Sequence, residues 1–111
     1  FTTPEKLVND PAVDAVFVLT NLESHLEYTK LALNAGKAVL VEKPVGVTVG
    51  EIEEMKALAA ARNLVVMPGH NYIYEAGMMR TRELVEENDL GRIVSAYVMY
   101  NLHHTEEIAS R

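Results

Sequence analysis

Short apolar runs alternate with longer segments along the first two thirds of the chain, and each longer segment carries its apolar residues on one helical face. The apolar runs are DAVFVLT (14–20), AVLVE (38–42) and LVVMPG (64–69). Valine-rich runs of this length are typical of strands buried on both faces of a parallel sheet. One expected helix lies between the first two runs and ends before Gly36. A capping box formed by Thr48 and Glu51 begins a second helix, which extends to about Arg62.

Strand, helix, strand, helix, strand at this spacing predicts two consecutive βαβ units, which require a parallel sheet with right-handed crossovers. A short helix over Thr3–Asn9 precedes them, with proline at its first helical position. A further helix (75–91) and a long strand-like run, RIVSAYVMYNL (92–102), break the rhythm. We therefore expect an α/β fold over residues 1–74 and the start of a second, sheet-containing domain over residues 75–111.

Composition narrows the classes of partner. The chain has 111 residues, a net charge of −6 and a pI near 5.1, which argues against binding to a nucleic-acid backbone. No apolar run approaches the roughly 18 residues of a membrane span, so we expect no membrane association. The absence of cysteine excludes disulfides and thiolate chemistry, and it fits a reducing, cytoplasmic location. Because the chain begins at Phe1, we interpret it as a fragment of a longer protein.

Polar side chains follow each expected strand at the point where its apolar run ends. Ligands of open parallel sheets bind beyond the carboxyl ends of the strands, so these residues are the candidate site. They are Thr20, Asn21 and, one helical turn on, His25; then Glu42, Lys43 and Pro44; then Gly69, His70 and Asn71. The strand bodies themselves are almost purely apolar. The sequence therefore predicts one polar rim that can meet a ligand.

The proline at position 44 restricts the backbone conformation of Lys43 and of the residues around it. A residue before proline is held out of the helical region, so we expect Lys43 to be extended. Pro44 ends the strand ladder because it lacks an N–H, and the sequence leaves open whether its peptide bond is cis or trans. Side chains of neighbouring residues in an extended segment diverge, so we expect Glu42 and Lys43 not to neutralise each other.

Three stretches closely resemble the Gfo/Idh/MocA family of NAD(P)-dependent oxidoreductases, which act on sugars, inositols and related polyols. They are VDAVFVLTNLESHLEYTKLALNAGKAVLVEKP (13–44), LVVMPGHNYIY (64–74) and LGRIVSAYVMYN (90–101). The Ala-Gly-Lys-x-Val-x-x-Glu-Lys-Pro block (35–44) is the most specific part. The resemblance implies that residues 1–74 are the second half of an NAD(P)-binding Rossmann domain. Residues 75–111 would then be a linker helix and the first strand of a carboxy-terminal α+β sheet domain.

The resemblance also implies roles for the polar rim. Lys43 would be catalytic, lying near the nicotinamide, hydrogen-bonding the substrate hydroxyl and sharing its proton while hydride leaves the carbinol carbon. Cofactor contacts with NAD or NADP would come from Thr20, Asn21, His25, Glu42, Lys43 and Pro44. Substrate contacts with the sugar or polyol would come from Lys43, His70 and Asn71. The full-length protein would be a homo-oligomer.

Some features depart from the family pattern. The Gly-x-Gly-x-x-Gly phosphate turn is absent, the family's acid/base histidine lies further on, and YIYEAG (72–77) replaces a common Arg-Phe pair. We therefore expect the isolated chain to be inactive and to bind the cofactor weakly. A non-catalytic family remnant, or a binding or regulatory module, is the alternative. A flavodoxin-like receiver is disfavoured because VLTN and MPGHN lack its acidic cluster and lysine.

Simpler interpretations stand beside several of these residues. His25 on an amphipathic helix is more typical of a packing histidine, and His70 can serve a turn. Glu42 can cap a helix, and Lys43 by itself resembles an ordinary lysine at a strand end. A cluster near the carboxyl end resembles metal ligands in composition, but adjacent histidines on a strand point to opposite faces, so we expect no metal site. That cluster is His103, His104, Glu106 and Glu107.

Overall fold

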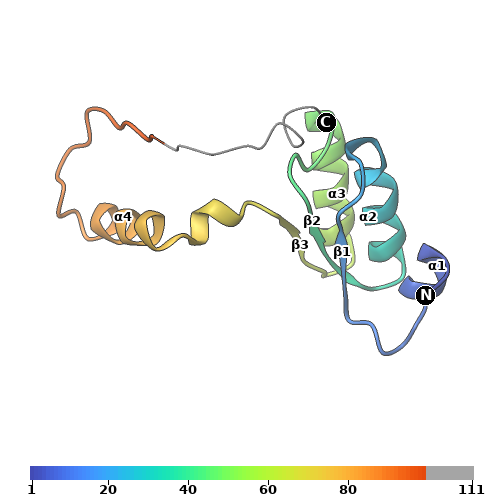
Figure 1. The fold of residues 1–111 in the computed structure, drawn as a ribbon. Helices are drawn as coiled ribbons and strands as arrows, with labels where there is room; N and C mark the ends of the chain where they lie inside the picture. Colours follow the sequence, from blue (N-terminus) through green and yellow to red (C-terminus); the bar gives the residue numbers. More distant parts are fainter. Residues whose placement is uncertain (100–111) are drawn as a thin grey trace, which may run out of the picture. The chain divides into compact units, whose positions relative to one another are not determined.

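The computed structural model describes residues 1–99 and divides the chain into two units, residues 1–73 and a second unit that begins at Tyr74. The first unit holds a parallel sheet of three strands in the order β1-β2-β3 (Figure 1). The strands are β1 (Ala15–Val18), β2 (Ala38–Val41) and β3 (Val66–Pro68). Val18 lies beside Val41, and Val41 lies beside Pro68. The expected α/β fold with a Rossmann-like parallel sheet is confirmed.

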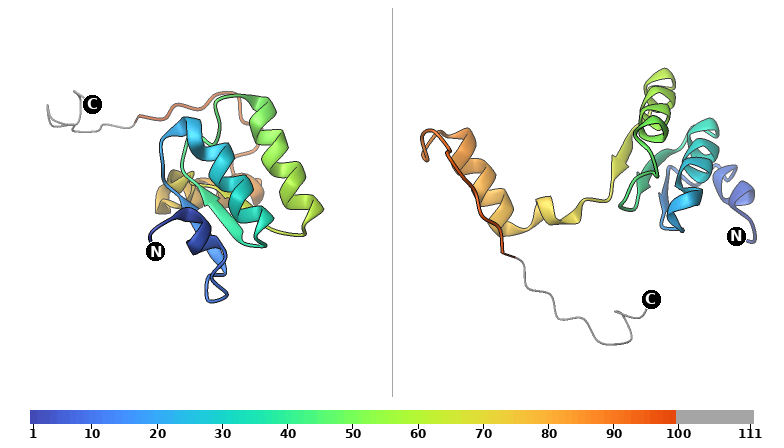
Figure 2. Two further views of the ribbon diagram at one scale, coloured as in Figure 1. Left: turned by 90° about the vertical axis from the view of Figure 1, so that its right-hand side faces the viewer. Right: turned by 90° about the horizontal axis from the view of Figure 1, so that it is seen from above.

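Helices connect the strands and cover one face of the sheet. They are α1 (Pro4–Val8), η1 (Leu22–Ser24), α2 (His25–Asn34) and α3 (Val49–Ala61). The side chain of Thr48 accepts a hydrogen bond from the Glu51 N–H, as the capping box predicts. Gly36 follows α2 with φ of +78°, a left-handed conformation that glycine adopts without strain. α2 and α3 pack side by side against the same face of the strands (Figure 2).

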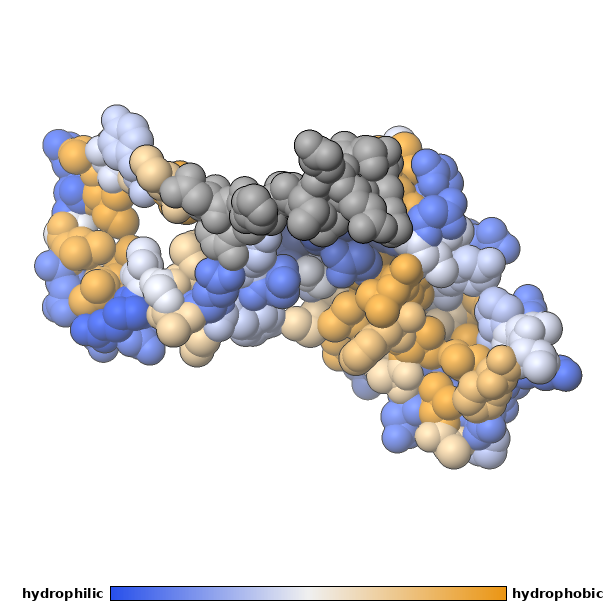
Figure 3. All heavy atoms as spheres, in the orientation of Figure 1, coloured by the Kyte–Doolittle hydropathy of each residue, from blue (hydrophilic) through white to orange (hydrophobic). Residues whose placement is uncertain are grey.

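The core lies between that face and the helices. Its fully buried members are Val8, Val18, Ala32, Leu33, Val39, Val41 and Ala59. Within the first unit, no helix covers the opposite face of the sheet: Phe17 is 67% exposed and Val65 is 65% exposed. Figure 3 shows a hydrophobic area over the strands. Within residues 1–73, the expectation of burial on both faces is therefore wrong, because both crossover helices lie on one side.

The second unit contains α4 (Ala76–Glu86), preceded by a 3-10 turn, η2 (Asn71–Tyr74), that begins after β3. α4 confirms the helix expected over 75–91, although it ends earlier. Residues 92–99 contain no strand, so the expected strand over 92–102 does not form in its described part; the remainder lies outside the described residues. A strand needs a neighbour for its backbone hydrogen bonds, and the described residues pair none with this segment. No helix of residues 1–99 is long and apolar enough to cross a membrane.

Candidate functional site

The carboxyl ends of the three strands bring the polar rim together within the first unit. Backbone hydrogen bonds continue across this edge: the Glu42 N–H donates to Val18 O at 2.9 Å, and the Gly69 N–H donates to Val41 O at 2.7 Å. The segments after β1, β2 and β3 are therefore neighbours. β2 is the middle strand, so Glu42 and Lys43 follow the centre of the sheet.

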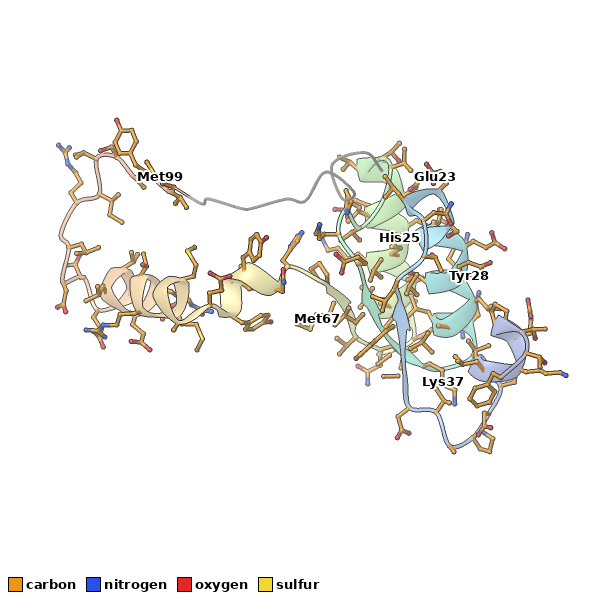
Figure 4. The ribbon with its side chains drawn as sticks, in the orientation of Figure 1. Glu23, His25, Tyr28, Lys37, Met67 and Met99 are labelled. Atoms are coloured by element: carbon orange, nitrogen blue, oxygen red, sulfur yellow. The ribbon has the colours of Figure 1, made fainter. Side chains whose placement is uncertain are left out.

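His25 lies beneath this rim, at the first residue of α2 (Figure 4). It is only 2% exposed. Its Nδ1 lies 2.9 Å from Pro44 O, and its Nε2 lies 3.0 Å from Thr20 O. Both ring nitrogens thus face backbone carbonyls, one in the segment after β1 and one in the segment after β2. No ring nitrogen is left for a cofactor, and the interpretation as a packing histidine describes the ring better.

Thr20 and Asn21 are exposed and are held by a serine that sequence reasoning did not single out. The Ser24 hydroxyl lies 2.7 Å from Thr20 Oγ1, 2.8 Å from Asn21 O and 2.8 Å from Asn21 Oδ1. The spacing of three to four residues before a helix is the signal that could have found it. The side chains after β1 are therefore preorganised by their own segment.

Glu23 carries the negative charge of this segment. A hydrogen bond from its own backbone N–H, then one from the Asn21 amide, hold the pKa of the Glu23 carboxyl below its ordinary value. The nearby charge of His25 lowers this pKa further. The Asn21 amide nitrogen lies 3.0 Å from Glu23 Oε2. The carboxylate of Glu23 is therefore favoured at the entrance to α2.

Glu42 and Lys43 form an exposed ion pair, which corrects the expectation that their side chains diverge. Lys43 Nζ lies 3.9 Å from Glu42 Oε1, and the side chains are 62% and 39% exposed, respectively. β2 ends at Val41, so the alternation of an extended strand does not extend to these residues. The Lys43–Pro44 peptide bond is cis. An ion pair this open contributes little to stability, and it leaves the ammonium accessible.

Gly69 has a steric role that the sequence did not reveal. A Cβ atom placed on Gly69 would lie 3.0 Å from Glu42 Oε2 and 3.2 Å from Val41 O. The missing side chain therefore lets the Glu42 carboxylate lie over the end of β3. His70 and Asn71 follow directly, and both are exposed. The rim thus gathers an ammonium, a carboxylate, an imidazole and an amide, a set that suits a ligand with many hydroxyl groups.

The described residues hold no phosphate cradle. Gly46 and Gly50 lie near the start of α3, and the N-terminus of this helix is already occupied by Thr48 and by the Glu51 carboxylate. A Cβ on Gly46 would lie 3.1 Å from Glu51 Oε2. A carboxylate at this position repels a pyrophosphate. The N-terminus of α3 therefore does not fit a diphosphate.

Two other features bear on ligand binding. A mostly apolar hollow of about 380 Å³ lies between α1, β1 and α2, and of the rim residues only Thr20 borders it. No group of three or more His, Cys, Asp or Glu within residues 1–99 could hold a metal ion. The histidines and glutamates at 103–107 lie outside the described residues. The rim, rather than the hollow, therefore concentrates the polar chemistry.

Residues 1–70 match the model of GFO_IDH_MocA, an oxidoreductase family with an NAD-binding Rossmann fold. The uncharacterized oxidoreductase YhhX of Escherichia coli (strain K12) is 41% identical over 90 residues, which cover 81% of this chain and 26% of YhhX. A crystal structure of a probable oxidoreductase yhhX superposes with a TM-score of 0.77 at 39% identity, covering 85% of this chain and 27% of that one.

Two further relatives have named reactions. The 1,5-anhydro-D-fructose reductase of Ensifer adhaerens is 37% identical over 102 residues, 92% of this chain and 31% of the reductase. The scyllo-inositol 2-dehydrogenase (NADP(+)) IolW of Bacillus subtilis (strain 168) is 32% identical over 102 residues, 92% of this chain and 28% of IolW. The chain therefore spans about a quarter to a third of the length of the relatives it matches.

Proposed function

The chain belongs to the Gfo/Idh/MocA family of NAD-binding oxidoreductases, and on this premise we propose that it carries the nicotinamide side of a dehydrogenase or reductase site. The reaction transfers hydride between NAD or NADP and a sugar, inositol or related polyol. The observation that carries the proposal is the position of Lys43, an accessible ammonium after the middle strand, beside Glu42 and between two further polar segments. The reactions named for the reductase and for IolW support the substrate class.

Lys43 is the proposed catalytic residue. A bound nicotinamide supplies the hydride acceptor or donor. Lys43 Nζ donates a hydrogen bond to the oxygen on the reacting carbon of the substrate. In oxidation the hydroxyl proton must leave as the hydride departs, and Lys43 in its neutral amine form accepts that proton and becomes the ammonium. In reduction the ammonium polarises the carbonyl and delivers the proton to the oxygen.

The other rim residues orient the two reactants. We assign the cofactor side to Thr20, Asn21, Glu42 and Pro44, and the substrate side to His70 and Asn71. His25 supports the cofactor side through the carbonyls of Thr20 and Pro44 and does not contact the cofactor through its ring nitrogens. The exposed side chains of His70 and Asn71 directly after β3 support the second assignment. Lys43 is too exposed among the described residues for a water-free site, so the exclusion of water is assigned to other parts of the protein.

Binding of the diphosphate is assigned to residues outside this chain. The occupied N-terminus of α3 supports this, because it offers no cradle for phosphate oxygens. We expect residues 1–111 alone to be inactive and to bind NADH only weakly. Calorimetric titration with NADH measures this, and micromolar affinity would contradict the expectation.

The test of the function is turnover by the native gene product that contains these residues, after its intact mass has been measured. Wild type should reduce NAD⁺ or NADP⁺ with at least one member of a panel of sugars and inositols. Lys43→Ala should lower kcat by about 10²- to 10⁴-fold, the range for a lost acid-base group. Lys56→Ala removes an exposed lysine of α3 and should leave kcat unchanged. Equal kcat in wild type and Lys43→Ala would refute the assignment.

A second candidate is a non-catalytic family member that binds a ligand or regulates a partner, favoured by the closed N-terminus of α3. A native product without a glycine-rich turn and without turnover would select it. We also propose a cytoplasmic homo-oligomer for the full-length protein. The apolar side chains exposed within residues 93–99 support the oligomer, because exposed apolar surface favours association with another protein surface.

A further inference from the structure

We propose that His25 is a positioning residue of this site: its imidazole ring, donating from both nitrogens, fixes the Lys43–Pro44 segment against the end of β1. The inference rests on the proposed function for its kinetic consequence. The claim that the ring donates to both carbonyls rests on the geometry alone.

The ring joins two segments that are distant in sequence. Thr20 and Pro44 lie five and 19 residues from His25, and their carbonyl oxygens lie 3.0 and 2.9 Å from its two nitrogens. The ring is almost fully buried. Buried carbonyls need donors, and a ring locked between two of them has no rotational freedom left. His25 therefore ties together the loops after β1 and β2.

Hydrogen-bond complementarity selects the form of the ring. A backbone carbonyl only accepts, and a neutral imidazole carries one N–H. In the neutral ring, one nitrogen lone pair would face a carbonyl oxygen at hydrogen-bond distance. The ring with a proton on both nitrogens satisfies both carbonyls with charge-assisted hydrogen bonds.

The anchor acts on Lys43 through the backbone. Pro44 O belongs to the peptide that follows Pro44, so the hydrogen bond holds Pro44 itself, whose ring nitrogen is bonded to the carbonyl carbon of Lys43. The side chain itself is mostly exposed, and its ion pair with Glu42 is long, so neither directs the ammonium strongly. Release of the anchor would let Lys43 leave its catalytic position. Misplacement of this kind lowers kcat more than it changes KM.

Three variants of the native gene product separate the two contacts. His25→Asn places an amide donor near the position of Nδ1 and keeps the contact to Pro44 O. His25→Gln places the donor near Nε2 and keeps the contact to Thr20 O. His25→Phe keeps the volume and neither donor. We expect kcat to fall about 10- to 100-fold in His25→Phe, and to fall least in His25→Asn.

Urea unfolding of the same variants separates positioning from simple destabilisation. Rescue of kcat by His25→Asn at a stability equal to that of His25→Gln supports the proposal. Equal kcat in His25→Asn and His25→Phe overturns it, and so does a loss of kcat that follows the loss of stability across the three variants.

The ring is observed directly by ¹⁵N NMR of histidine-labelled native protein near neutral pH. Two N–H signals for His25, assigned by their absence in His25→Phe, support the two-donor ring; one pyridine-type nitrogen overturns it. If wild type turns over no polyol, the proposed function fails, and the backbone amide signal of Lys43 then decides the anchor. That signal should shift in His25→Phe and stay nearer to wild type in His25→Asn; no shift in either variant overturns the anchor.

Discussion

Of two buried polar side chains in α2, one has hydrogen-bond partners and the other has none among the described residues. Both ring nitrogens of His25 face carbonyls at hydrogen-bond distance. Thr29 is fully buried, and its hydroxyl has no hydrogen-bond partner among residues 1–99. Leaving a buried hydroxyl unpaired costs free energy, whereas removing a paired donor leaves its partners unsatisfied. The two residues should therefore respond oppositely to apolar substitution.

We expect Thr29→Val to stabilise the protein. Valine keeps the branched shape and removes the unpaired hydroxyl, and the gain in the free energy of unfolding should be about 1 kcal/mol. Thr29→Ser is the matched control: it keeps the hydroxyl, loses the methyl group and should be destabilised. Urea unfolding measures both. A valine variant less stable than wild type would mean that the Thr29 hydroxyl is satisfied.

Gly69→Ala should disturb the Glu42 carboxylate. The added methyl would meet Glu42 Oε2 at 3.0 Å and the backbone of Val41 at 3.2 Å, and the backbone cannot move freely. We expect a loss of about 1–3 kcal/mol in unfolding free energy, typical of overpacking. Gly77→Ala in α4 is the control, because nothing lies within 4 Å of its Cβ position, and it should be neutral or stabilising. Equal stability of wild type and Gly69→Ala would contradict the close approach.

At the scale of elements, the N-termini of α2 and α3 differ in how their polar side chains are used. At the start of α3, Thr48 Oγ1 accepts a hydrogen bond from the Glu51 N–H, and the Glu51 carboxylate accepts one from the Val47 N–H, which together close the N-terminus. α2 follows η1 directly, and the polar side chains in and just before η1 form hydrogen bonds with one another and remain at the rim. The first arrangement stabilises a helix, and the second presents groups to a ligand.

The charge of Glu23 at the start of α2 should make stability depend on pH. Its pKa is held below the ordinary value of 4.5, so its contribution is fully present above that pH and is lost as pH falls through the folded-state pKa. We expect Glu23→Gln to be less stable than wild type at about pH 7, with the difference narrowing by about pH 3. Urea midpoints at the two pH values measure this. If the stability difference between wild type and Glu23→Gln were larger at the acidic pH, the pKa of Glu23 would be raised rather than lowered by folding.

At the scale of the whole molecule, the first unit by itself covers its sheet on one side only. Its inner face carries the buried valines of β1 and β2, whereas Phe17, Leu19 and Val65 are exposed on or beside the strands. Exposed apolar side chains beside a strand with an unpaired edge favour association. This face therefore needs a cover that residues 1–73 do not supply.

We expect residues 1–111, produced alone, to self-associate through that face. Phe17→Ser with Leu19→Ser should shift the population toward monomer, because both changes remove exposed apolar surface. Val49→Ser changes a valine of α3 that is even more exposed and should leave association unaltered. Sedimentation velocity over a range of concentrations measures the populations. A wild-type chain that stays monomeric at every concentration would show that this face does not drive self-association.

The sequence by itself determined the local structure and the family. The capping residues Thr3 and Thr48, the glycine at 36 and the three valine-rich runs act over a few neighbouring residues, so their outcome could be predicted without knowing what packs where. The convergence of Thr20, Lys43 and His70 segments on one rim followed from the rule for parallel strands.

The tertiary structure decided which atoms meet. The two carbonyls held by His25, the approach of Gly69 to Glu42 and the ion pair of Glu42 with Lys43 join atoms whose separation depends on strand register and on the path of the chain after each strand. The one-sided sheet and the absence of a strand in residues 92–99 depend on which neighbours are available. Apolar patterning specifies that a segment must be buried or paired, and only the assembled chain specifies the partner.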